Sequence, residues 1–79
     1  MKKKRPTSID IDLHGLKHAQ AAFYLIRKIE DLWDTGYDVN IITGHSEKMK
    51  EIVRRILNEY EVDYNEDHPF NKGMIRTTL

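Results

Sequence analysis

The sequence predicts a single α/β domain built as two layers, with two helices covering one face of a β-sheet. Three observations carry this prediction. A short segment near the start of the chain alternates strictly between apolar and polar residues, and two later segments carry apolar residues at helical spacing. The chain has 79 residues, which is the length of one small domain with a thin core. The predicted order of elements is β-α-β-α-β-β.

The composition excludes several classes of protein. There is no cysteine, which excludes a disulfide framework and a thiolate metal site. No apolar run approaches the ~18 residues of a transmembrane helix, and no signal-peptide core follows the basic start of the chain. We therefore expect a cytoplasmic protein that does not associate with membranes.

Charge is distributed unevenly along the chain, although 13 basic and 13 acidic residues balance. Four basic residues stand near the start: Lys2, Lys3, Lys4 and Arg5. We define residues 1–8 as a basic N-terminal arm and residues 9–79 as the folded domain. Such an arm is able to contact phosphate groups, and a solvated tail is the alternative interpretation. Residues 58–67 hold five acids and no Lys or Arg.

The first predicted strand covers residues 9–14, where apolar and polar residues alternate. A period of two places alternate side chains on opposite faces of a strand. One face therefore carries Ile9, Ile11 and Leu13, and the other carries Asp10, Asp12 and His14. Gly15 then ends the strand.

Two helices follow from the apolar periodicity. The first is predicted over residues 17–35, with Gly36 as its C-terminal cap and the apolar face Ala22, Leu25, Ile26, Ile29, Leu32 and Trp33. Trp33 is thus expected in the core. The second helix begins after Ser46, a predicted N-cap, and runs to about Tyr60. Its apolar face is Met49, Ile52, Val53, Ile56, Leu57 and Tyr60.

Three further strands are predicted at residues 39–42, 62–64 and 74–79. The consecutive isoleucines Ile41 and Ile42 favour a central strand buried on both faces. Right-handed crossovers would then place both helices on one face of the sheet if the first three strands progress in one direction. The polar row of the first strand would lie on the open face, where a large ligand can reach it.

Asp12 and His14 are the candidate catalytic residues. They lie on one side of a strand, roughly 6.5–7 Å apart along it. A neighbouring carboxylate can orient an imidazole for general acid or base chemistry. Gly15 allows a sharp turn and the close approach of a substrate. An ordinary exposed strand end is the alternative interpretation.

The second candidate site is the turn formed by Thr43, Gly44, His45 and Ser46. Free backbone amides at the start of a helix favour phosphate binding, and Lys48 and Lys50 follow in the first turns. Both turns come after parallel strands, so they are expected at the same edge of the sheet. A plain turn with solvated lysines is the alternative. A divalent ion held by Asp10, Asp12 and His14 is possible but not favoured, and no cofactor is predicted.

These segments together resemble the Smr (small MutS-related) domain, over about residues 9–79, as a small stand-alone member. The resemblance rests on Asp12-Leu13-His14-Gly15-Leu16 after an alternating strand, and on Ile41-Ile42-Thr43-Gly44 after a helix. It implies a βαβαββ sandwich with a four-stranded mixed sheet, similar to the C-terminal domain of translation initiation factor 3. It also implies nucleic-acid endonuclease activity: RNA cleavage, often on ribosome-bound messages, and nicking of DNA in some members.

The family carries two motifs, and this chain keeps the first intact. The second, His-Gly-x-Gly, falls on residues 43–46, where Gly44 is kept and His45 occupies the variable position. One hypothesis is an endonuclease that favours RNA over DNA. It would use Asp12 and His14, with nucleic acid bound by the arm and by Gly15, Thr43, Gly44, His45, Ser46, Lys48 and Lys50. The alternative is a non-catalytic RNA-, DNA- or ribosome-binding module.

Overall fold

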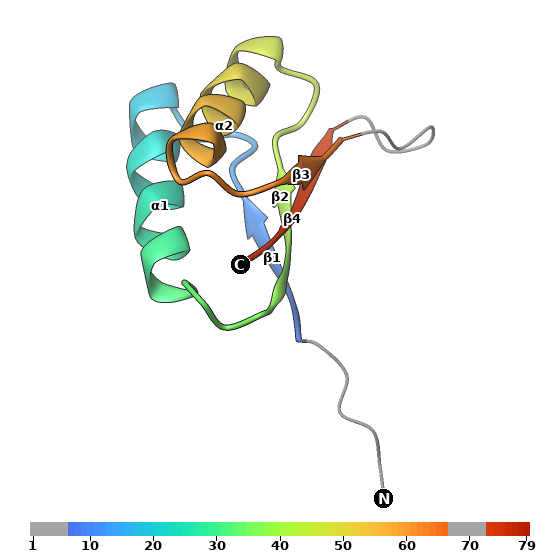
Figure 1. Ribbon diagram of the computed structural model, residues 1–79. Coiled ribbons are helices and arrows are strands. Elements are labelled where there is room, and N and C mark those ends of the chain that lie inside the picture. Colours follow the sequence, from blue (N-terminus) through green and yellow to red (C-terminus); the bar gives the residue numbers. More distant parts are fainter. Residues whose placement is uncertain (1–6, 67–72) are drawn as a thin grey trace, which may run out of the picture.

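The computed structural model describes residues 7–66 and 73–79 and shows the predicted order of elements (Figure 1). Four strands form one mixed sheet, and two helices pack against it. The elements are β1 Ser8–Asp12, α1 His18–Asp31, β2 Asp38–Ile42, α2 Glu47–Glu59, β3 Tyr64–Asn65 and β4 Met74–Thr78. Both helices lie on the same face of the sheet, so the predicted two-layer sandwich is confirmed.

The strands lie in the order β1-β2-β4-β3 across the sheet. β1 and β2 are parallel, whereas β4 runs antiparallel to both β2 and β3. The strand order makes β2 an inner strand, as predicted. Because β1 and β2 run in the same direction, their carboxyl ends meet at one edge of the sheet. We call this edge the carboxyl edge, and define it as residues 14–17 after β1 and residues 43–50 after β2.

The alternation in β1 has the predicted consequence. Ile11 and Leu13 are buried, whereas Asp10, Asp12 and His14 are exposed on the open face. β1 begins at Ser8 and ends at Asp12, two residues earlier than predicted. Pairing nevertheless continues one step further, because the amide of Leu13 donates to the Ile42 carbonyl at 2.8 Å. This bond holds the next residue, His14, close to the sheet.

The core lies between the sheet and the helices. Each helix buries one residue per turn: Ala21, Leu25 and Ile29 in α1, and Met49, Val53 and Leu57 in α2. The strands contribute Ile11, Val39, Ile41 and Ile75, with Leu13 immediately after β1. Fully burying one such aliphatic side chain stabilises a fold by about 1.5–3 kcal/mol. The carboxyl edge therefore belongs to strands whose helix-facing side is firmly packed.

The end of α1 differs from its prediction. The helix stops at Asp31 with Leu32 as its C-cap, so Gly36 is not the cap but lies in the following turn at φ +78°. Trp33 is 47% exposed and not in the core. Its ring lies 5.5 Å from that of Tyr60, centroid to centroid. The prediction failed because the regular rotation of 100° per residue ends with the helix.

Two strand predictions also need correction. β2 is buried on one face only, since Val39 and Ile41 are buried while Asn40 and Ile42 are half-buried on the open face. β3 is shorter than predicted and is shifted to Tyr64–Asn65. Within the described part of the chain, neither helix is long and apolar enough to span a membrane.

Candidate functional site

Residues 13–16 form a tight turn directly after β1. The amide of Leu16 donates to the Leu13 carbonyl at 3.1 Å, and Gly15 has φ +88°. A positive φ at the third position of a β-turn is typical of type II and favours glycine. The chain turns at Gly15 after the strand, as the sequence predicted. The turn leaves the side chain of His14 on the open face.

The carboxylate of Asp12 orients His14 through two hydrogen bonds. Oδ1 of Asp12 accepts one from the backbone amide of His14 at 3.1 Å and lies 3.2 Å from the ring Nδ1. With the ring proton on Nδ1, the imidazole donates to Asp12 and Nε2 remains as a proton acceptor. Both side chains are largely exposed, at 67% for His14 and 58% for Asp12. The pair can therefore take up or release a proton on an incoming ligand.

Gly44 lies against His14 from the neighbouring strand end. A Cβ atom added to Gly44, which has φ +71°, would lie 3.4 Å from the His14 Cβ. The two turns that the sequence placed at one edge of the sheet are thus in contact. Because Gly44 has no side chain, its backbone can approach His14 this closely.

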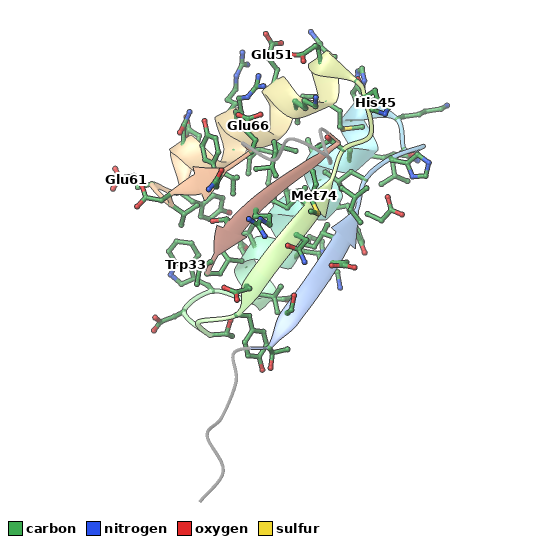
Figure 2. The ribbon with its side chains drawn as sticks, turned by 90° about the vertical axis from the view of Figure 1, so that its right-hand side faces the viewer. Trp33, His45, Glu51, Glu61, Glu66 and Met74 are labelled. Atoms are coloured by element: carbon green, nitrogen blue, oxygen red, sulfur yellow. The ribbon has the colours of Figure 1, made fainter. Side chains whose placement is uncertain are left out.

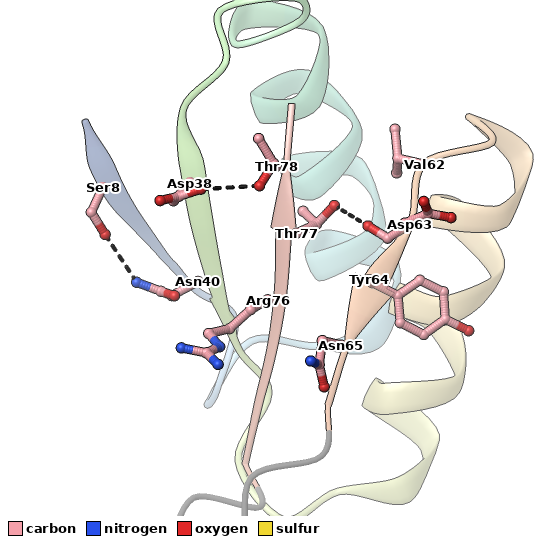
Figure 3. Close-up of a pocket in the computed structure, with 10 residues that line it drawn as sticks. All are labelled: Ser8, Asp38, Asn40, Val62, Asp63, Tyr64, Asn65, Arg76, Thr77 and Thr78. Carbon is pink, nitrogen blue, oxygen red and sulfur yellow. Dashed lines mark hydrogen bonds between the residues drawn. The ribbon is translucent and has the colours of Figure 1, made fainter. Parts of the chain in front are cut away.

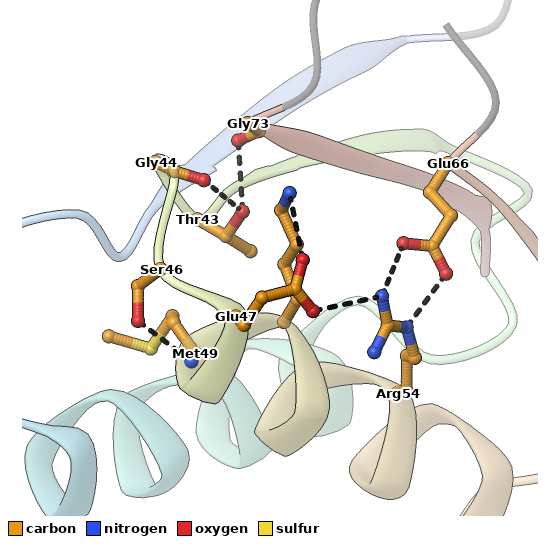
Figure 4. A network of polar contacts seen from close by, with 9 residues as sticks. Thr43, Gly44, Ser46, Glu47, Met49, Arg54, Glu66 and Gly73 are labelled. Atoms are coloured by element: carbon orange, nitrogen blue, oxygen red, sulfur yellow. Dashed lines mark hydrogen bonds and ion pairs between the residues drawn. The ribbon is translucent and has the colours of Figure 1, made fainter.

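Gly73 holds the Gly44 turn in place (Figure 4). Its carbonyl accepts hydrogen bonds from the amides of Thr43, at 2.7 Å, and Gly44, at 3.1 Å. It also lies 3.1 Å from the hydroxyl of Thr43, which is 2% exposed. Two of the amides predicted to face a phosphate are therefore engaged inside the protein. Sequence reasoning did not select Gly73 as a site residue, because its partners lie far away in the chain.

The first turn of α2 is capped and carries charge of both signs. The Ser46 hydroxyl accepts from the Met49 amide at 3.1 Å, which confirms the predicted N-cap. Lys50 is mostly buried and lies 3.8 Å from the Glu47 carboxylate, so part of its charge is already balanced. His45 and Lys48 are exposed. They are the side chains of this turn best placed to meet a ligand.

Lys17 is a further exposed cation at the carboxyl edge, and sequence reasoning did not select it. It is the N-cap residue of α1 and makes no side-chain capping bond there. Its position directly after the Gly15 turn brings it to the same edge as His14 and Lys48. The signal that could have found it is its place immediately after the Asp12-Leu13-His14-Gly15 motif.

An ion pair beside the site ties α2 to the end of β3. Arg54 donates to the Glu66 carboxylate from two nitrogens, at 2.8 and 3.0 Å (Figure 4). These hydrogen bonds lower the pKa of Glu66 and raise the pKa of Arg54, against the opposing effect of partial burial. The guanidinium is also 4.0 Å from Glu47. Arg54 is therefore committed to structure and is not a free phosphate ligand.

The predicted arm residues Lys2, Lys3, Lys4 and Arg5 lie outside the described residues. The described chain begins at Thr7, whose carbonyl accepts from the Asp38 amide at 2.9 Å. This is the amino end of β1, roughly 13 Å along the strand from Asp12. Contact between the arm and nucleic acid stays a prediction.

A hollow of about 730 Å³ lies on the open face but does not include Asp12 or His14 (Figure 3). Its lining carries the carboxylates of Asp38 and Asp63 and the guanidinium of Arg76. Excess negative charge makes it a poor seat for phosphate, so the acid–imidazole pair is the better candidate for chemistry. Within the described residues, no cluster of three or more His, Cys, Asp or Glu could hold a metal ion.

Together the fold and the site define an α/β sandwich that presents a carboxylate-oriented histidine beside a glycine turn. The chain is similar to the crystal structure of a human small-MutS related domain, with a TM-score of 0.66 and 26% identity. The match covers 89% of this chain and 99% of that domain. No protein-family model and no curated protein sequence matches the chain. The structural similarity confirms the Smr resemblance that the Asp12–Gly15 motif predicted.

Proposed function

We propose that this chain is a nucleic-acid endonuclease of the Smr type that acts on RNA, with Asp12 and His14 as its catalytic residues. One observation carries the proposal. A single oxygen of Asp12 accepts from the His14 backbone and faces its Nδ1, which orients an exposed imidazole beside the Gly44 turn. The similarity to a small-MutS related domain adds support for a domain of the nucleic-acid-binding or nuclease type.

RNA supplies its own nucleophile for this chemistry. Nε2 of His14 removes the proton from a 2′-hydroxyl, and the 2′-oxygen attacks the adjacent phosphorus. The bond from phosphorus to the 5′-oxygen then breaks, which leaves a 2′,3′-cyclic phosphate and a 5′-oxygen that takes a proton from water. Asp12 stabilises the imidazolium that forms. Lys48 and the start of α2 would balance the charge that develops on the phosphate.

A binding module without turnover is the second candidate. It is favoured by the use of the Thr43 and Gly44 amides, which bind the Gly73 carbonyl and so offer less to a transition-state phosphate. The departure from the second family motif at Thr43 and Ser46 points the same way. In this case the carboxyl edge would bind nucleic acid or a ribosomal surface without any cleavage.

A cleavage assay decides between the two candidates. End-labelled single-stranded RNA and supercoiled plasmid are incubated with the parent, Asp12→Ala and His14→Ala, with and without chelator. We expect the His14→Ala variant to cleave RNA about 100-fold or more slowly than the parent. His18→Ala is the matched control, because His18 is also exposed but begins α1 and is not bonded to Asp12 within the described residues.

Equal rates for the parent and His14→Ala would contradict a catalytic role. Salt-sensitive binding that survives His14→Ala, without any cleavage, would establish the binding module.

A further inference from the structure

The register of the sheet arranges the side chains of the open face in rows. The first row is Ser8, Asp38 and Thr78, and the second is Asp10, Asn40, Arg76 and Asn65. The third row is Asp12, Ile42 and Met74. Two rows are polar, as expected for a face turned toward water. The third joins an apolar pair to one of the proposed catalytic residues.

Ile42 and Met74 are direct neighbours on β2 and β4, and both are half-buried. Opposed side chains on adjacent antiparallel strands have Cβ atoms about 4.5–5.5 Å apart, so the two form one continuous apolar surface. Met74 is labelled on the open face in Figure 2, which views the sheet with the helices behind it. Part of this surface remains accessible from the open side.

The apolar pair borders the acid–imidazole pair on two sides. Asp12 lies beside Ile42 in the same row. Gly44 comes two residues after Ile42, and a Cβ atom added to it would lie 3.4 Å from the His14 Cβ. Because Gly44 has no side chain, a flat group lying on Ile42 and Met74 could extend over Gly44 toward the imidazole.

Charge indicates which part of a nucleotide fits this surface. The two polar rows carry the carboxylates of Asp10 and Asp38 and the guanidinium of Arg76, so their net charge is negative. Asp10 accepts from Asn40 at 2.9 Å, and Asp38 accepts from Thr78 at 3.0 Å. These carboxylates repel phosphate. The exposed lysines Lys17 and Lys48, in contrast, lie at the carboxyl edge. A sugar-phosphate backbone is therefore favoured along the edge, with the uncharged base turned inward over the apolar pair.

We infer that Ile42 and Met74 form the floor of a nucleobase subsite beside Asp12 and His14. The subsite takes an unpaired base, because the faces of a paired base are covered by its stacked neighbours in a duplex. The thioether of Met74 adds a favourable contact of sulfur with an aromatic ring. This inference rests on the proposed function and specifies its substrate as single-stranded nucleic acid.

An abasic scan tests the subsite. Affinities are measured by fluorescence anisotropy for a short single-stranded RNA with 2′-O-methyl groups, which block cleavage, and with one abasic residue placed at each position in turn. For the parent, loss of the base at one position should weaken binding about fivefold. In Met74→Ala the same abasic residue should cost almost nothing, and Met74→Leu should restore most of the loss. Thr78→Ala, on the same face of β4, is the matched control and should behave as the parent.

Two results would overturn the subsite while leaving the proposed nuclease intact. One is an equal abasic penalty in the parent and Met74→Ala at every position. The other is equal affinity of the parent for single-stranded and duplex RNA of the same sequence at the same salt concentration. If no nucleic acid binds at ~50 mM salt, where phosphate contacts are strong, the subsite and the proposed function both fail.

Discussion

Gly73 shows how a residue far along the chain from Asp12 and His14 controls the geometry of the candidate site. Its carbonyl fixes Thr43 and Gly44, and Gly44 in turn contacts His14. A Cβ atom on Gly73 would lie 3.1 Å from three backbone atoms of Gly44. Backbone atoms cannot rotate away as the end of a side chain can, so the turn itself would have to move. Gly73 is thus a positioning residue for the site.

We predict that Gly73→Ala lowers kcat for RNA cleavage about tenfold and leaves KM nearly unchanged, because small misplacements of reacting groups are costly. Steady-state kinetics and thermal unfolding measure the two effects separately. Gly36→Ala is the control: a Cβ there meets nothing within 4 Å, but φ is +78°. It should lower the free energy of unfolding by about 1 kcal/mol and leave kcat unchanged. A loss of activity that follows stability in both variants would contradict the positioning role.

The placement of Asp12 and His14 could be predicted from the sequence alone, and the contacts that support them could not. Strict alternation in residues 9–14 is a local pattern, and it placed Asp12 and His14 on the open face. The bonds from Gly73 to Thr43 and Gly44 depend on pairing between β2 and β4, and that pairing has no local signature. The Ile42–Met74 neighbourhood depends on the same register.

At the scale of elements, helix interiors were predicted better than helix ends. The apolar stripe and the Ser46 cap of α2 follow from spacing and from one side chain. The end of α1 does not, because Gly36 looked like a cap while the helix stops before it at Asp31. Trp33 was consequently assigned to the core, although it packs beside Tyr60 at the surface. The hydroxyl of Tyr60 donates to Glu30 at 3.0 Å, which joins the two helices.

The pair of Arg54 and Glu66 makes the attachment of α2 to β3 sensitive to acid. The pKa of Glu66 lies below its ordinary value of 4.5, chiefly because Arg54 donates to the carboxylate. The pair therefore stabilises the fold fully above pH 4.5, and this contribution is lost as the pH falls below 4.5 through the lower pKa of the folded state. Both side chains are about one-third exposed, so the contribution is modest.

We predict that Glu66→Gln is less stable than the parent by about 0.5–1 kcal/mol at neutral pH, and that the difference disappears near pH ~3. Urea unfolding at a series of pH values measures it. Glu51→Gln is the control, since Glu51 is exposed on α2, the helix that carries Arg54, and makes no ion pair within the described residues. A difference for Glu66→Gln that persists at pH ~3 would show that the effect is packing and not charge.

The molecule as a whole is neutral, yet it separates its charges in space. The exposed cations Lys17 and Lys48 lie at the carboxyl edge. The open face beside that edge presents the carboxylates of Asp10, Asp12 and Asp38 and the guanidinium of Arg76. Net charge alone would not indicate nucleic-acid binding. The arrangement favours a strand that follows one edge of the sheet over one that lies across it.

We predict that the double variant Asp10→Asn, Asp38→Asn binds single-stranded RNA about threefold more tightly than the parent at ~10 mM salt, where charges act over about 30 Å. The gain should vanish near ~1 M salt, where that distance is about 3 Å. Titrations across this range measure it. Asp31→Asn, Asp34→Asn is the matched control, because it removes the same charge near the far end of α1. An equal gain in the control would assign the effect to net charge alone.

The position of β1 at the border of the sheet has a consequence for self-association. In the described structure β1 pairs with β2 on one side, so its other side presents backbone groups that another chain could pair with. If a second copy paired there antiparallel, Asp10 and Asp12 of the two copies would be brought together on one face. Like charges opposed across strands are unfavourable. The carboxylates that direct a ligand toward the carboxyl edge therefore also oppose aggregation through the unpaired side of β1.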